Sequence, residues 1–183
     1  MHALLTRLSL AQSTPLSETL RVALGAVVLF ACTQVSIPLN PVPITLQTLG
    51  VLLIGLTYSP KEALKTLLLY VGCGLLGLPV FTNFGTGIGK LLGPTGGYLI
   101  GFILAAPTMA WLLSQIKTRS GWTLLLACAI GQTLIYAFGL IWLSTFLGVQ
   151  GALQHGLLPF ILPGAVKAVG LSAILGYVKQ KAR

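Results

Sequence analysis

The sequence predicts an all-α membrane protein with six transmembrane helices and both termini in the cytoplasm. Of its 183 residues 55% are hydrophobic and only 7% are charged, and its mean hydropathy is +0.94. A soluble domain carries about 25% charged residues, so this chain has too few charges to cover a surface that faces water. We expect residues 1–18 to form an N-terminal cytoplasmic or interfacial segment and residues 19–183 to form a single membrane domain.

Six apolar stretches give the number of helices. A helix needs about 20 apolar residues to cross a bilayer, and the second stretch is shorter, so we expect it to draw on the residues before it. Only Tyr58–Glu62 separates the second stretch from the third, and Pro60 there can begin a helix, which predicts a helical hairpin. No strand-like alternation occurs, so each span is expected to be helical. The stretches are residues 19–36, 44–57, 61–79, 95–115, 121–147 and 157–178.

The basic residues give the orientation. With the N-terminus inside, Lys90 is in an outer connection and Lys167 is within the sixth span, whereas the other nine of the eleven Lys and Arg residues fall on the cytoplasmic side. Cytoplasmic loops of membrane proteins are enriched in such residues. The basic residues that give the net charge of +9 therefore indicate how the chain is oriented in the membrane, and no nucleic-acid partner is expected. The nine residues are Arg7, Arg21, Lys61, Lys65, Lys117, Arg119, Lys179, Lys181 and Arg183.

Two outer segments hold uncharged polar groups that topology does not explain. The first is "NPVPITLQTLG", residues 40–50, in which prolines stiffen the chain and Thr45 and Gln47 follow. In an extended segment these two side chains could line different sides of a ligand pocket. They could equally bond neighbouring backbone groups, since both carry donors and acceptors.

The second outer segment is the glycine-rich stretch "GLPVFTNFGTGIGKLLGPTGGYLIGF", residues 77–102. Gly85 permits close approach of the backbone to a ligand, Asn83 and Thr86 offer neutral hydrogen-bonding groups, and Lys90 offers a positive charge. Tyr98 could wall an apolar ligand or belong to an interfacial aromatic belt. A flexible outer loop without a ligand is the alternative, and the phosphate-binding G-x-x-x-x-G-K-[ST] pattern is absent.

Lys167 lies in the apolar sequence "LLPFILPGAVKAVGL", residues 157–171. It precedes Lys179 by twelve residues, or about 18 Å of helix, which places it in the outer half of the membrane. A charge at the centre of a spanning helix costs about 2.5–3.5 kcal/mol. Lys167 either extends to the outer surface or faces a cavity, where we expect it to bind a ligand carboxylate.

Catalysis and metal binding are not expected. The chain has no aspartate, its two glutamates lie on the inner side, and His2 and His155 stand alone. The three cysteines, Cys32, Cys73 and Cys128, lie in apolar stretches and suggest neither disulfides nor a metal site. Ion-coupled transport usually requires an acid within the membrane. The residues therefore indicate a membrane protein that binds a small, partly apolar anion and has no energy source of its own.

The chain also resembles a known family. The sequences "PVPITLQTLGVLLIGL", "GLPVF", "GIGKLLGPTGGYLIGF" and "LPF" followed by "PG" and a lysine resemble the BioY family, the biotin-binding S components of energy-coupling factor (ECF) transporters. The resemblance covers about residues 20–175. It implies six helices with both termini cytoplasmic, which agrees with the charge distribution, and a location in the bacterial cytoplasmic membrane.

The resemblance implies a ligand and partners. The ligand would be biotin, with no cofactor, and the partners would be a transmembrane coupling subunit and two cytoplasmic ATPase subunits. Lys167 matches the family's binding lysine, Asn83 matches a ligand asparagine, and Thr45 and Gln47 fall in the family's first-loop motif. A solitary facilitator or channel for a related vitamin or small organic anion is the alternative, and in that form the protein could be a homo-oligomer.

Two positions depart from the family's pattern. The family has P-G-D-x-x-K near the sixth helix, whereas this chain has "LPGAVK", with Gly164 in the place of the aspartate. S components often carry A-x-x-x-A on the first helix for docking the coupling subunit, whereas here Val27 follows Ala23. The first departure removes an expected polar contact with the ligand, and the second alters the docking face.

Overall fold

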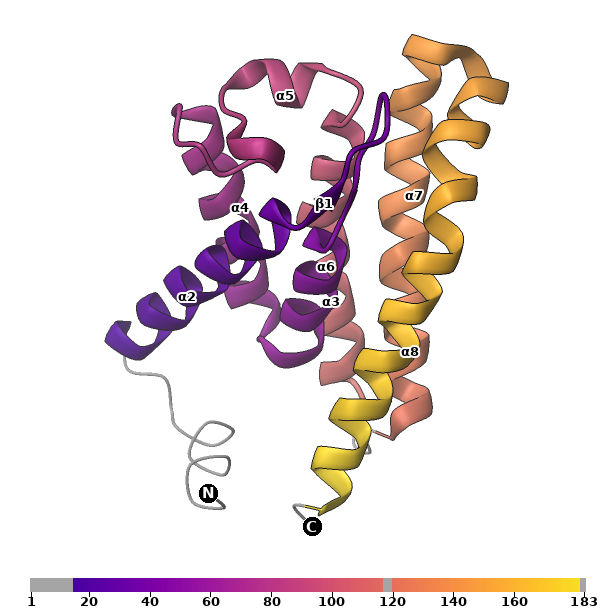
Figure 1. The fold of residues 1–183 in the computed structure, drawn as a ribbon. Coiled ribbons are helices and arrows are strands. Elements are labelled where there is room, and N and C mark those ends of the chain that lie inside the picture. Colours follow the sequence, from indigo (N-terminus) through magenta and orange to yellow (C-terminus); the bar gives the residue numbers. More distant parts are fainter. Residues whose placement is uncertain (1–14, 117–119, 182–183) are drawn as a thin grey trace.

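A computed structural model describes residues 15–116 and 120–181, which form a bundle of helices with one short two-stranded ladder (Figure 1). The first predicted span and the last coincide with helices that begin and end within a few residues of the expected bounds. The long helices are α2 (Pro15–Gln34), α3 (Gln47–Thr57), α4 (Pro60–Leu75), α6 (Gly96–Ser114), α7 (Gly121–Ala152) and α8 (Leu158–Lys181).

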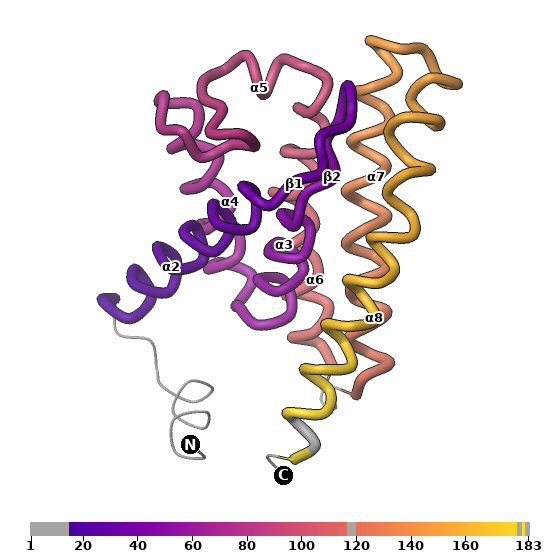
Figure 2. Tube along the Cα trace, in the orientation of Figure 1, coloured from indigo at the N-terminus to yellow at the C-terminus, as the bar shows by residue number. Residues whose placement is uncertain are grey.

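Short elements connect these helices at one end of the bundle. Strand β1 (Ser36–Ile37) pairs antiparallel with β2 (Ile44–Thr45), and the α4–α6 connection contains the 3₁₀-helix η1 (Thr82–Phe84) and the short α5 (Ile88–Leu92). The β-hairpin, α5 and the turn after α7 lie at the upper end in Figures 1 and 2, whereas α2 begins and α8 ends at the lower end.

The second predicted span differs from the structure at its start. Residues 44 and 45 are paired in β2, so α3 begins only at Gln47 and has 11 residues. The prolines of residues 40–50 lack N–H groups and do not favour a longer helix there. The expectation that the second span draws on the residues before it is therefore wrong, and the helix is shorter than the apolar stretch 44–57.

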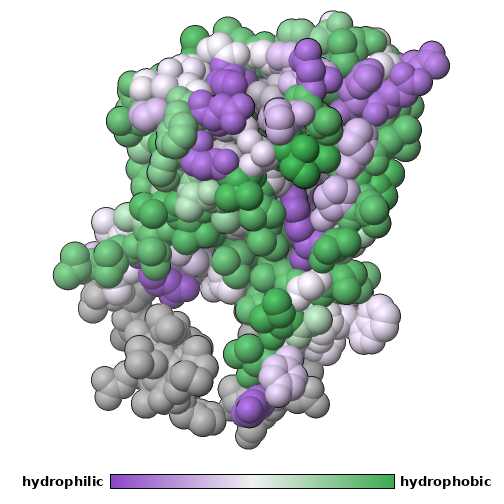
Figure 3. All heavy atoms as spheres, in the orientation of Figure 1, coloured by the Kyte–Doolittle hydropathy of each residue, from purple (hydrophilic) through white to green (hydrophobic). Residues whose placement is uncertain are grey.

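Three helical stretches of the described residues are long and apolar enough to cross a membrane: Pro15–Gln34, Gly96–Ser114 and Gly121–Val178. The third contains both α7 and α8, which pack against each other after the chain reverses near Gly148, where φ is 70°. Figure 3 shows hydrophobic side chains over the middle of one face and hydrophilic side chains gathered at its upper end.

The N-terminal segment predicted for residues 1–18 falls largely outside the described residues. Only Pro15–Glu18 is described, and it forms the first turn of α2. Of the basic residues that give the predicted orientation, Arg7, Lys117, Arg119 and Arg183 also lie outside.

The predicted hairpin between α3 and α4 is confirmed. The Ser59 hydroxyl accepts a hydrogen bond from the Glu62 backbone N–H at 3.3 Å, and the Glu62 carboxylate accepts one from the Ser59 N–H at 2.9 Å. This capping box satisfies two N–H groups that a helix start leaves free, and Pro60 occupies the first turn. The sequence "SPKE" is therefore sufficient to begin α4 at this point.

Both acids of the sequence fasten α2 to α4 at the lower end of the bundle. Lys65 Nζ lies 2.6 Å from Glu18 Oε1, and Arg21 Nε lies 3.5 Å from Glu62 Oε1. The Arg21 guanidinium also lies over the Tyr58 ring, 5.2 Å from its centroid. The Lys65–Glu18 pair is exposed, and such pairs stabilise a fold little, whereas the Glu62 side chain is 7% exposed and its charge is balanced by Arg21.

Helices α6 and α7 share the most extensive helix–helix contact among the described residues. An ideal Cβ on Gly101 of α6 would lie 2.9 Å from the Cα of Ile135 on α7. Small residues let two helix backbones approach each other in a membrane protein. Gly101 therefore sets the distance between these two helices.

We expect Gly101→Ala to destabilise the protein by about 1–3 kcal/mol, because the new methyl group meets backbone atoms that cannot give way. Gly72→Ala on α4 is the matched control, since a Cβ there meets nothing within 4 Å and alanine favours a helix by up to about 1 kcal/mol. Thermal unfolding in detergent measures both. Equal shifts for the two variants would contradict close packing at Gly101.

Candidate functional site

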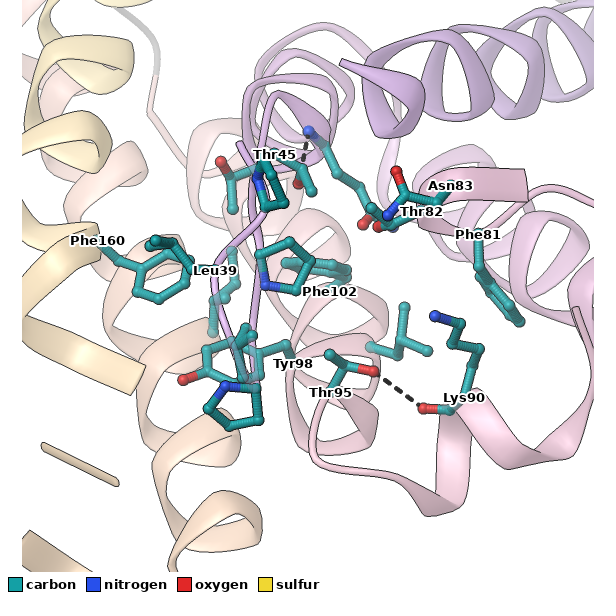
Figure 4. Close-up of a pocket in the computed structure, with 18 of the residues that line it drawn as sticks. Leu39, Thr45, Phe81, Thr82, Asn83, Lys90, Thr95, Tyr98, Phe102 and Phe160 are labelled. Carbon is teal, nitrogen blue, oxygen red and sulfur yellow. Dashed lines mark hydrogen bonds between the residues drawn. The ribbon is translucent and has the colours of Figure 1, made fainter. Parts of the chain in front are cut away.

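A cavity of ≈ 250 Å³ opens at the upper end of the bundle. The β-hairpin, the η1–α5 connection and helices α6, α7 and α8 enclose it (Figure 4). Its lining combines prolines and aromatic rings with a few polar side chains. The lining residues are Pro38, Leu39, Pro41, Val42, Pro43, Thr45, Gln47, Thr48, Phe81, Thr82, Asn83, Lys90, Thr95, Tyr98, Leu99, Phe102, Ile135, Tyr136 and Phe160.

Five of the eight predicted site residues line this cavity, although they come from separate segments. Lys167 bonds two lining residues, Thr45 and Thr48, without lining the cavity itself, and Gly85 and Thr86 are absent from the lining. The five are Thr45, Gln47, Asn83, Lys90 and Tyr98.

Gln47 is held in the cavity wall by a buried tyrosine. Its side chain is 5% exposed, and Gln47 Nε2 donates to the Tyr70 hydroxyl at 3.2 Å. Tyr70 Oη also lies 3.0 Å from Thr33 Oγ1 and donates to the Val80 carbonyl at 2.9 Å. One hydroxyl thus joins α2, α3, α4 and the segment that leads to η1. The arrangement fixes the Gln47 amide while leaving its carbonyl oxygen without a partner among the described residues.

The turn that carries Asn83 is fixed by Gln34 at the end of α2. Gln34 Nε2 donates to the Phe81 carbonyl at 3.2 Å, and Gln34 Oε1 accepts from the Phe84 N–H at 3.1 Å. Asn83 has φ 57°, a left-handed conformation that asparagine adopts more readily than most residues. Its amide oxygen accepts a hydrogen bond from the Ser36 hydroxyl at 3.4 Å. This geometry places Asn83 on the cavity side opposite Phe160 (Figure 4).

Lys90 extends from α5 toward the space between Phe81 and Phe102 (Figure 4). Its ammonium has no side-chain partner among the described residues, and the Thr95 hydroxyl fixes its backbone carbonyl at 3.1 Å. The Lys90 side chain runs so close to Gly85 that a Cβ on Gly85 would overlap it. Gly85 therefore makes room for Lys90 instead of lining the cavity itself.

Lys167 bridges α8 to the start of α3. Its ammonium donates to the Thr45 carbonyl at 2.6 Å and to the Thr48 hydroxyl at 2.7 Å. The side chain is half-buried, so it does not extend to the outer surface as one alternative supposed. An ammonium has three N–H donors, so these two bonds leave one N–H without a partner among the described residues, although Lys167 stands behind Thr45 and Thr48 and is not itself a lining residue.

Tyr98 closes the cavity toward α8. Its hydroxyl donates to the Gly156 carbonyl at 2.7 Å, and its ring centroid lies 6.1 Å from that of Phe160. A Cβ on Gly139 would overlap the ring of Tyr98. The structure therefore gives Tyr98 a wall position, with its hydroxyl already bonded.

Sequence reasoning missed a polar pair on α7. Gln132 Nε2 donates to the Gly164 carbonyl at 2.7 Å, and the Tyr136 hydroxyl donates to the Phe160 carbonyl at 2.9 Å. The two side chains are four residues apart, so they lie on one helix face, and their partners are four residues apart on α8. A polar pair at this spacing in an otherwise apolar span is the signal that could have identified them.

Comparison with known proteins identifies similar chains. The sequence model of the BioY family matches residues 6–183. A "Probable biotin transporter BioY" of Rickettsia prowazekii is 33% identical over 174 residues, which cover 95% of this chain and 89% of the relative. A "Biotin transporter BioY2" of Lactococcus lactis is 36% identical over 160 residues, which cover 86% of this chain and 87% of the relative.

A solved structure shares the fold. The S-component for biotin from an ECF-type ABC transporter superposes with a TM-score of 0.83 over 93% of this chain and 95% of that one. The sequence identity is 24%, so this likeness concerns the arrangement of the helices.

We expect Tyr70→Phe to destabilise the protein by about 1–3 kcal/mol, because it leaves the buried Gln47 Nε2 without its partner and leaves the Val80 carbonyl with only the longer bond from Gln34 Nε2, at 3.5 Å. Tyr177→Phe is the matched control, since Tyr177 is 65% exposed and the change should fall within about 0.5 kcal/mol. Thermal unfolding of both variants in detergent tests this. A Tyr70→Phe protein as stable as the control would show that the hydroxyl does not join the four segments.

Proposed function

Because the chain belongs to the BioY family, we propose that it binds biotin from the outer face of the membrane and takes it up as the S component of an ECF-type ABC transporter. The observation that carries this proposal is the cavity, in which apolar walls surround neutral amide groups and a lysine without a partner among the described residues. Relatives named as biotin transporters along most of the chain support the same ligand.

The chemistry of biotin matches the cavity. Biotin has an apolar thioether ring, which Phe102, Phe160 and Leu39 would contact. Its neutral ureido group needs hydrogen-bond donors and acceptors, which the amides of Gln47 and Asn83 supply. Its single carboxylate needs a cation. A site of apolar walls with a few placed polar groups is typical for a small ligand.

The two lysines have different roles in this proposal. Lys90 lines the cavity and lacks a partner among the described residues, which supports it as the partner of the carboxylate. The Lys167 ammonium already bonds Thr45 and Thr48, so its third N–H would reach the ureido carbonyl. The sequence alone suggested that Lys167 binds the carboxylate, and its bonds in the structure favour this second assignment.

The partners would be a transmembrane coupling subunit and two cytoplasmic ATPases. The relatives are named as transporters, and we propose no enzymatic activity for this chain. One face of α2 is exposed and apolar, with Leu16 80% and Leu20 69% exposed, and includes Ala23 and Val27. Gly25 instead packs on Thr66 of α4. This exposed face supports docking of the coupling subunit on α2. We also propose that the protein spans the cell membrane six times, with both termini inside.

We expect Lys90→Ala to weaken biotin binding about 10- to 100-fold, the loss for a hydrogen bond between charged groups, and to weaken biotin amide much less. Lys167→Ala should weaken both ligands alike, because the ureido group is common to them. Calorimetric titration of purified wild type and both variants with each of the two ligands measures all six affinities. A selective loss of biotin in Lys167→Ala would assign the carboxylate to Lys167, and wild-type protein that binds no biotin would contradict the proposed function.

We expect biotin to accumulate in cells that express this chain together with a coupling subunit and ATPases, and not in cells that lack them, because the chain carries no nucleotide-binding motif. Uptake of labelled biotin with and without the partners tests this. Accumulation against a gradient without any coupling subunit would contradict the S-component role. Equilibration without accumulation would identify a facilitator.

A further inference from the structure

Gly164 and Tyr136 form a matched pair between α8 and α7. A Cβ on Gly164 would overlap the Tyr136 hydroxyl and would lie 3.2 Å from Gln132 Oε1. The hydroxyl reaches the Phe160 carbonyl at 2.9 Å, across the space that a side chain at position 164 would fill. Glycine at this position therefore permits the bond between Tyr136 and α8.

The Tyr136 hydroxyl is oriented by this bond. Its single proton is donated to the Phe160 carbonyl, so the oxygen can only accept from other groups. Tyr136 lines the cavity together with Phe160 and Ile135. Of these three lining residues from α7 and α8, Tyr136 is the one with a polar side chain. The wall opposite Asn83 thus presents a fixed, uncharged acceptor.

No acid competes for this role within the described residues. Glu18 and Glu62, the two acids of the sequence, are engaged with Lys65 and Arg21 at the far end of the bundle. A ligand N–H that points toward α7 and α8 must therefore meet a neutral acceptor. The Tyr98 hydroxyl, on α6, also donates to a carbonyl, but its bond to Gly156 is buried, whereas the bond from Tyr136 to Phe160 is only partly buried.

We propose that the Tyr136 hydroxyl accepts a hydrogen bond from one ureido N–H of the ligand, and that Gly164 is required because it leaves room for this hydroxyl. The inference rests on the proposed function, since the ureido group belongs to biotin. It makes Tyr136 a ligand-binding residue and Gly164 a positioning residue. It also explains how the cavity binds a neutral N–H group although position 164 carries no carboxylate.

Titration of detergent-purified Tyr136→Phe with biotin, and with biotin methylated at either ureido nitrogen, tests the contact. The variant should bind biotin about 3- to 10-fold more weakly than wild type, the loss expected for one neutral hydrogen bond. One of the two methylated ligands lacks the ureido N–H that is proposed to bond Tyr136. The variant and wild type should bind that ligand with equal affinity. An unchanged affinity for biotin, or the same loss for all three ligands, would overturn the contact.

A double-variant cycle tests the pairing without the analogues. Gly164→Ala should weaken biotin about 10-fold in wild type, because the methyl group displaces the hydroxyl, and by less than about 3-fold in Tyr136→Phe, where the overlapping atom is gone. Equal losses in the two backgrounds would overturn the pairing. Wild-type protein that fails to bind biotin would instead contradict the proposed function.

Discussion

The cavity depends on one interaction, the pair of hydrogen bonds from the Lys167 ammonium to the Thr45 carbonyl and the Thr48 hydroxyl. A charged group inside a spanning helix must find polar partners, and this chain has no acid near it. The partners are instead a backbone carbonyl at the end of the β-hairpin and the hydroxyl in the first turn of α3. This requirement ties α8 to the hairpin and so determines where one wall of the cavity lies.

The opposite wall is built from polar groups that are bonded to each other before any ligand arrives. Tyr70 and Gln34 hold the α4–α6 connection against α2 and α3, and Asn83 sits in the turn that they fix. Buried polar groups are costly unless they are hydrogen-bonded, so these bonds both stabilise the fold and limit the positions that the wall can take. A preorganised site loses less free energy on ordering when it binds.

The sequence predicted the helices well and the contacts between them poorly. Each apolar stretch of the sequence overlaps one long helix of the described residues, although α3 begins later than expected, and the capping pattern of "SPKE" located the α3–α4 turn. The sequence also grouped Thr45, Gln47, Asn83 and Lys90 on one side of the membrane. It could not show that Lys167 bonds the hairpin or that Gly85 makes room for Lys90, because such contacts depend on helix rotation and tilt. The pairing of Tyr136 with Gly164 arises from close packing between helices, for which a single sequence gives no spacing rule.

Ligand protection of an engineered cysteine tests most directly that this cavity is the biotin site. In a variant without Cys32, Cys73 and Cys128, Thr82→Cys places a thiol in the lining, whereas Leu153→Cys places one at an exposed position in the π-helix η2 (Leu153–Leu157), which joins α7 to α8. We predict that saturating biotin slows maleimide labelling of Thr82→Cys and leaves labelling of Leu153→Cys unchanged. Biotin that binds while Thr82→Cys is labelled at its original rate would place the site elsewhere and contradict the account.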